Sequence, residues 1–125
     1  MKAKVLIILL LCMYVVSLLV GHLCNFIAVD YYEGKMPVIR EIAIKYSGSE
    51  KVEAKEEEGV IFIDEGDKYS KLVDRYPKIM NTEDIGYIYY SIGDIVLFCS
   101  WVELIITIIL ASVYIIMYVQ KDRHS

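Results

Sequence analysis

The sequence predicts a mainly α-helical membrane protein, built as a two-helix transmembrane hairpin with a small α+β domain between its spans. Hydrophobic residues make up 57% of the 125 positions, which is more apolar surface than so small a soluble domain can bury. The charged residues, 24% of the chain, are also segregated. Residues 5–29 contain no Asp, Glu, Lys or Arg, and residues 95–119 contain only Glu103.

Each of these two apolar segments has 25 residues. A helix of that length is about 38 Å long and crosses a hydrocarbon core of ~30 Å with some tilt. Lipid offers the backbone no hydrogen-bond partners, so helix is the expected state of both spans. The alternative, two core helices of a soluble protein, is disfavoured because the rest of the chain is too small to cover them. Residues 1–4 and 120–125 are then short tails.

The first span has a second interpretation, a cleaved signal peptide, because Lys2 and Lys4 precede it. Its apolar run is much longer than the ~7–15 residues of a signal-peptide core. A small-x-small cleavage site does not stand out near Ser17 or Gly21. We therefore expect the segment to be retained as an anchor; cleavage would leave a single-pass protein with the same exposed domain.

Basic residues near the ends of the spans predict the orientation. Lys2 and Lys4 precede the first span, and Lys121 and Arg123 follow the second. We therefore expect a multi-pass protein of the cell membrane with both termini cytoplasmic and residues 30–94 extracytoplasmic.

Residues 30–94 contain nine basic and fifteen acidic residues. This acidic excess argues against nucleic acid as a partner. About 65 residues can fold alone, but so small a core is marginal by surface-to-volume scaling. The expected partners are therefore the lipid bilayer and other membrane subunits or a second copy of the chain.

Within this section, β-branched residues and alternation predict a short antiparallel sheet from residues 38–46, 51–57 and 60–64. The first of these segments also matches helical spacing, so its assignment stays open between strand and helix.

Helical spacing follows the sheet. One face carries Tyr69, Leu72, Val73 and Tyr76, which predicts one helix, ended by Pro77. A further amphipathic helix, capped at Asn81 or Thr82, is expected to lead directly into the second span.

Glu103 is the most informative residue of the spans, because a carboxylate inside a bilayer costs roughly 2.5–3.5 kcal/mol on insertion scales. It lies about 12 Å beyond Ile95 at helical rise, and His22 lies about 10 Å inside Val29. In an antiparallel hairpin the two residues fall at similar depth, with Asn25 one turn nearer the outer surface. The sequence therefore predicts an intramembrane polar contact of His22, Asn25 and Glu103.

Three roles for this contact stay open. The first is a structural hydrogen bond worth about 1 kcal/mol. The second is a pairing of Glu103 with a basic residue of another subunit, and the third is a proton or ion relay. Small residues on one face of each span predict close helix packing. These residues are Ser17, Gly21, Cys24 and Ala28 on the first span, and Thr107 and Ala111 on the second.

Motifs for catalysis, metal binding and cofactor binding are absent from the sequence. The section between the spans has neither histidine nor cysteine. The three cysteines, Cys12, Cys24 and Cys99, fall in the spans and are expected to be free thiols, although a bridge between the last two is geometrically possible. We therefore expect no enzymatic activity, no metal and no cofactor.

Together these observations predict a small accessory or assembly subunit of a membrane complex, with an extracytoplasmic docking domain. The alternative is a transport or channel component that uses Glu103.

Overall fold

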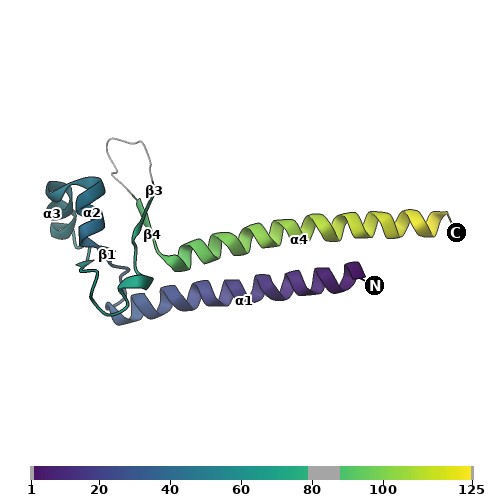
Figure 1. Cartoon of the computed structure of the whole chain (residues 1–125), viewed down its shortest axis with the longest axis horizontal. Coiled ribbons are helices and arrows are strands. Elements are labelled where there is room, and N and C mark those ends of the chain that lie inside the picture. The colour runs from purple at the N-terminus through teal and green to yellow at the C-terminus, as the bar shows by residue number, and fades with distance from the viewer. Residues whose placement is uncertain (1, 79–87, 125) are drawn as a thin grey trace.

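The computed structural model describes residues 2–78 and 88–124. Two long helices, α1 (Lys2–Tyr31) and α4 (Ile92–Arg123), run antiparallel and side by side (Figure 1). A small α+β region lies at one end of the pair, and both termini lie toward the other end (Figure 1). The prediction of a mostly helical chain with two long apolar helices flanking a small α+β region is confirmed.

Both helices are long and apolar enough to cross a membrane. In their most apolar 18-residue windows, only 0% of α1 and 6% of α4 is buried inside the molecule. The core helices of a soluble protein would instead have most of these residues buried. The apolar side chains of the pair therefore point outward.

The region between the long helices differs from the prediction in its first half. A strand was expected at residues 51–57, and residues 38–46 were left open between a preferred strand and a helix. The chain forms helices α2 (Arg40–Ser47) and α3 (Ser49–Glu57). The strand prediction for α3 was wrong because its Ala, Glu and Lys residues favour helix. In α2, burying Ala43 against α3 outweighs the β-branched content. Gly48 joins the two helices at a φ of +88°, a conformation that side chains disfavour.

A short strand at residues 60–64 is confirmed, as β2 (Phe62–Ile63). It pairs with β1 (Val38–Ile39), but the pairing is parallel, so the predicted antiparallel arrangement is wrong here. Parallel strands need a crossover of a dozen or more residues, usually helical. The α2–α3 pair is that crossover.

The predicted helix over residues 69–76 is also wrong. The chain forms a single 3₁₀ turn, η1 (Ser70–Leu72), and then strand β3 (Tyr76–Lys78), which pairs antiparallel with β4 (Ile88–Tyr90). Backbone pairing decides this: Asp74 exchanges hydrogen bonds with residues 37 and 39, so residues 73–75 cannot close a helical turn.

The helix predicted to precede the second span is wrong at residues 88–90, which form β4. The proposed caps Asn81 and Thr82 lie outside the described residues. Helix α4 instead begins at Ile92, with Ser91 as its N-cap.

Two small clusters form the core of the α+β region. One joins the end of α1 to the region, through Ala28, Ile39, Ile63 and Val73. The other holds α2 and α3 on the β1–β2 pair, through Val38, Ala43 and Val52. The first cluster fixes the region against α1.

Candidate functional site

Small and polar side chains line the contact between α1 and α4, and we call this set the interhelical seam. Its members are Ser17, Gly21 and Asn25 of α1, the N-cap residue Ser91, and Gly93, Asp94 and Glu103 of α4. On α1 they recur at intervals of four residues, which keeps them on one helical face. The seam is thus the polar strip of an otherwise apolar helix pair.

Asn25 connects α1 to the first turn of α4. Ser91 and Asp94 form a capping box: the Ser91 hydroxyl accepts from the Asp94 backbone N–H at 3.1 Å, and the Asp94 carboxylate accepts from the Ser91 N–H at 3.1 Å. The Asn25 amide group donates to Asp94 Oδ1 at 2.9 Å and accepts from Ser91 Oγ at 2.6 Å. Asp94 also suits the positive end of the helix dipole. One side chain of α1 therefore fixes where α4 begins.

Next to this network the two helices meet at Gly21 and Gly93. A Cβ atom placed on Gly93 would lie 2.2 Å from Asn25 Oδ1 and 2.8 Å from the Gly21 carbonyl oxygen. A Cβ on Gly21 would lie 2.8 Å from Leu97 Cγ and 3.0 Å from the Gly93 carbonyl oxygen. Both positions lack room for any side chain, so the backbones approach as closely as in small-residue helix packing.

Glu103 has its partners within the helix pair. Its Oε2 accepts a hydrogen bond from the Ser17 hydroxyl at 2.9 Å, and its backbone carbonyl accepts one from the Thr107 hydroxyl at 2.7 Å. The Ser17 oxygen also lies 2.5 Å from the Met13 carbonyl oxygen, so its single proton serves only one acceptor at a time. Thr107 is 2% exposed. Because its Oε2 is bonded to Ser17 of α1, the Glu103 carboxyl group points into the seam.

The remaining residues predicted at this site are distributed as follows. His22 lies exposed on α1, about 100° around the helix from Gly21; among the described residues, the side-chain hydrogen bond to Glu103 comes from Ser17. Cys24 and Ala111 are half-buried, and Ala28 is fully buried. The cysteines are free thiols.

Asp74 lies where the α+β region meets the seam. Its backbone N–H donates to the Pro37 carbonyl, and its carbonyl accepts from Ile39. Its Oδ1 is buried and has no hydrogen-bond partner among the described residues. Burial, reinforced by the negative charge of Asp94, raises the pKa of Asp74 from 3.8 to about 7. This carboxyl group has the largest pKa shift among the described residues.

An aromatic group surrounds Lys68 at the end of α1. The Lys68 ammonium lies 5.4 Å from the ring centre of Tyr31 and 5.2 Å from that of Tyr69, and the two rings meet edge to face. Such cation–π pairs contribute about 0.5–1 kcal/mol at exposed sites. Tyr32 donates its hydroxyl to the Lys68 carbonyl. These contacts fasten the residues just before η1 to the end of α1.

Comparison with known protein families, curated proteins and solved structures finds no match to this chain. Among residues 2–78 and 88–124, no three His, Cys, Asp or Glu side chains are grouped in a way that could hold a metal ion.

Sequence reasoning missed Ser91, Gly93, Asp94 and Asp74. A signal for the cap was present, because Ser91-x-x-Asp94 immediately before an apolar run is a capping-box pattern. The role of Gly93 could not be seen, since it depends on which residue of α1 faces it. The environment of Asp74 likewise depends on long-range backbone pairing.

Proposed function

We propose that this chain is a two-pass integral membrane protein that serves as a small accessory or assembly subunit of a membrane complex. In this proposal α1 and α4 cross the cell membrane, both termini are cytoplasmic, and the α+β region is an extracytoplasmic docking domain. The supporting observation is that two long, outward-facing apolar helices pack on each other through a polar seam, with a small separate region at one end.

The seam supports a structural role for the helix pair. Asn25, Ser91 and Asp94 satisfy one another, and Glu103 has Ser17 as a partner. In bilayers, such interhelical hydrogen bonds contribute about 0.6–2 kcal/mol each and fix register. A hairpin held in this way is a rigid support for the domain that it carries.

The α+β region supports a docking role. Seven hydrophobic side chains are buried in its core, one of them from α1, which is a small core for a domain that folds unaided. Helix α2 meanwhile exposes 41% of Ile44. Helix α3 exposes the acidic residues Glu50, Glu53 and Glu57, whereas its Glu56 is paired with Arg40. A partner with an apolar contact and basic neighbours would cover both surfaces.

Site-specific photo-crosslinking in native membranes tests this function. A photoreactive residue at Ile44 is expected to give one discrete adduct with a larger membrane protein. The same photoreactive residue at Glu53, on α3, probes the acidic surface. The adduct is expected to persist in a Glu103→Leu variant, because Glu103 is bonded within the hairpin.

Two results would count against the proposal. The first is a chain that stays monomeric at every probe position. The second is purified protein in liposomes that moves protons or ions and loses this activity in Glu103→Leu, which would support the transport alternative.

A further inference from the structure

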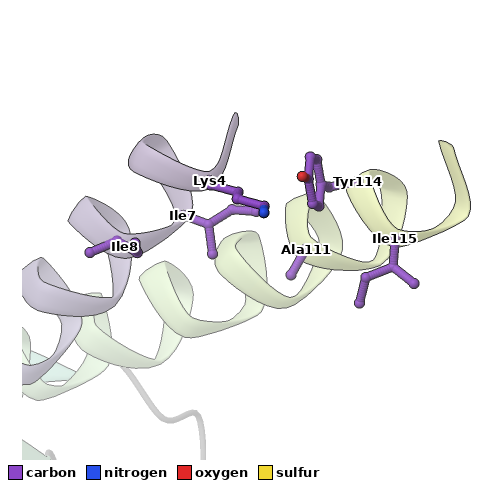
Figure 2. Close-up of a pocket in the computed structure, with 6 residues that line it drawn as sticks. All are labelled: Lys4, Ile7, Ile8, Ala111, Tyr114 and Ile115. Atoms are coloured by element: carbon purple, nitrogen blue, oxygen red, sulfur yellow. The ribbon is translucent and has the colours of Figure 1, made fainter. Parts of the chain in front are cut away.

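A groove lies between the N-terminal end of α1 and the C-terminal half of α4. Its volume is about 290 Å³, and its lining residues are Lys4, Ile7, Ile8, Ala111, Tyr114 and Ile115 (Figure 2). Among the described residues, the last side-chain hydrogen bond of the seam on this side is the one from Ser17 to Glu103. Helix α4 also continues past the end of α1 (Figure 1).

The groove has a charged rim and an apolar floor. Figure 2 shows the Lys4 ammonium pointing across the gap toward Tyr114, with Ile7 and Ala111 beside it. Lys4 is the last charged residue before the apolar stretch, and Ile8 lies one helical turn deeper. In a membrane-spanning helix pair, this order places the cation at headgroup level and the floor at the level of acyl chains.

The charges at this end of the helix pair have one dominant sign. The described ends of the two helices carry Lys2, Lys4, Lys121 and Arg123, against Asp122 alone. Basic pockets between membrane helices on the cytoplasmic side attract anionic lipid headgroups, and each basic residue near such a surface contributes about 1 kcal/mol. The volume lies at the lower limit for small-molecule sites, which suits one acyl chain better than a whole soluble ligand.

We propose that this groove binds one anionic phospholipid from the cytoplasmic leaflet, with an acyl chain along Ile7, Ile8 and Ala111 and the headgroup phosphate on Lys4. This inference rests on the proposed placement of α1 and α4 in the membrane. It adds a ligand site to a protein whose sequence carries no ligand-binding motif. The Tyr114 ring lies at the cytoplasmic end of the site, near the Lys4 ammonium (Figure 2).

Native mass spectrometry of the full chain, released from nanodiscs that contain equal amounts of phosphatidylglycerol and phosphatidylcholine, tests the site. The wild type is expected to retain one phosphatidylglycerol with roughly tenfold preference. Lys4→Gln is expected to reduce this preference to about twofold or less. Lys2→Gln removes the same charge two residues away, outside the groove, and is expected to keep most of the preference.

A second variant tests the floor. Ala111→Phe fills the groove and is expected to abolish retention of either lipid. Val113→Phe, on an exposed face of the same helix, is the matched control and is expected to retain lipid. Circular dichroism confirms that each variant is helical before it is compared.

Three outcomes would overturn the site. They are equal loss of preference in Lys4→Gln and Lys2→Gln, unchanged retention in Ala111→Phe, and a dimer of the chain that Ala111→Phe dissociates without affecting lipid. Flotation of the wild type with lipid vesicles distinguishes failure of the groove proposal from failure of the membrane placement. A chain that does not float contradicts the proposed function. A floating chain without lipid preference contradicts the groove alone.

Discussion

Gly93→Ala is expected to lower the free energy of unfolding by about 2–4 kcal/mol, the largest effect expected among the glycines that the structure describes. The added Cβ would lie 2.2 Å from Asn25 Oδ1 and 2.8 Å from a backbone oxygen of α1. Relieving these contacts requires the helices to separate and Asn25 to give up its bonds to the cap of α4. Alanine's better helix propensity, worth about 1 kcal/mol, offsets only part of this loss.

Substitutions at two other glycines provide comparisons for the loss of stability in Gly93→Ala. In Gly21→Ala the nearest atoms belong to the flexible Leu97 side chain, so a smaller loss is expected. Gly66→Ala places its Cβ in open space and is expected to stay within about 0.5 kcal/mol of the wild type. Unfolding in bicelles measures all three. Equal values for Gly93→Ala and Gly66→Ala would show that α1 and α4 do not pack as described.

Asp74 is expected to make the protein less stable as the pH rises from 5 to 8. Its pKa is about 7 in the folded protein and near 3.9 in an unfolded chain. The folded state therefore holds the proton more tightly, and this contribution, fully present below about pH 4, is lost as the pH rises through about 7. Asp74→Asn, which cannot ionise, is expected to flatten this dependence and to be about 1 kcal/mol more stable than the wild type at pH 8.

The measurement is the difference in unfolding free energy between wild type and variant at pH 5 and pH 8. Asp30→Asn removes an exposed carboxylate at the end of α1 and is the control for the loss of one negative charge. A pH dependence that is the same with and without Asp74 would mean that its carboxyl group is not buried as described.

The long helices were predictable because their signal is local. An uninterrupted apolar stretch predicts helix whatever surrounds it, and α1 and α4 contain the predicted spans in full. The region between them was harder, because its elements are short and depend on partners far along the chain. Residues 73–75 carry a helical pattern, yet they are extended because Arg75 and Asp74 bond to residues 90 and 37.

For the candidate site, likewise, only the features with a local signal could be predicted from the sequence. Ser17, Gly21 and Asn25 could be named from sequence because small and polar residues within an apolar stretch are conspicuous. Their partners could not be assigned, since depth alone does not determine which helical face turns inward. The structure places Ser17 opposite Glu103, and Asn25 opposite the cap of α4.

The central claim, that α1 and α4 form a membrane hairpin with the α+β region outside, is tested most directly by labelling single cysteines with a membrane-impermeant maleimide. In a background without Cys12, Cys24 and Cys99, we expect Glu57→Cys to react in intact cells. We expect Ala3→Cys and His124→Cys to react only after the membrane is permeabilised. Labelling of either terminus in intact cells, or of Glu57→Cys only after permeabilisation, would contradict the hairpin.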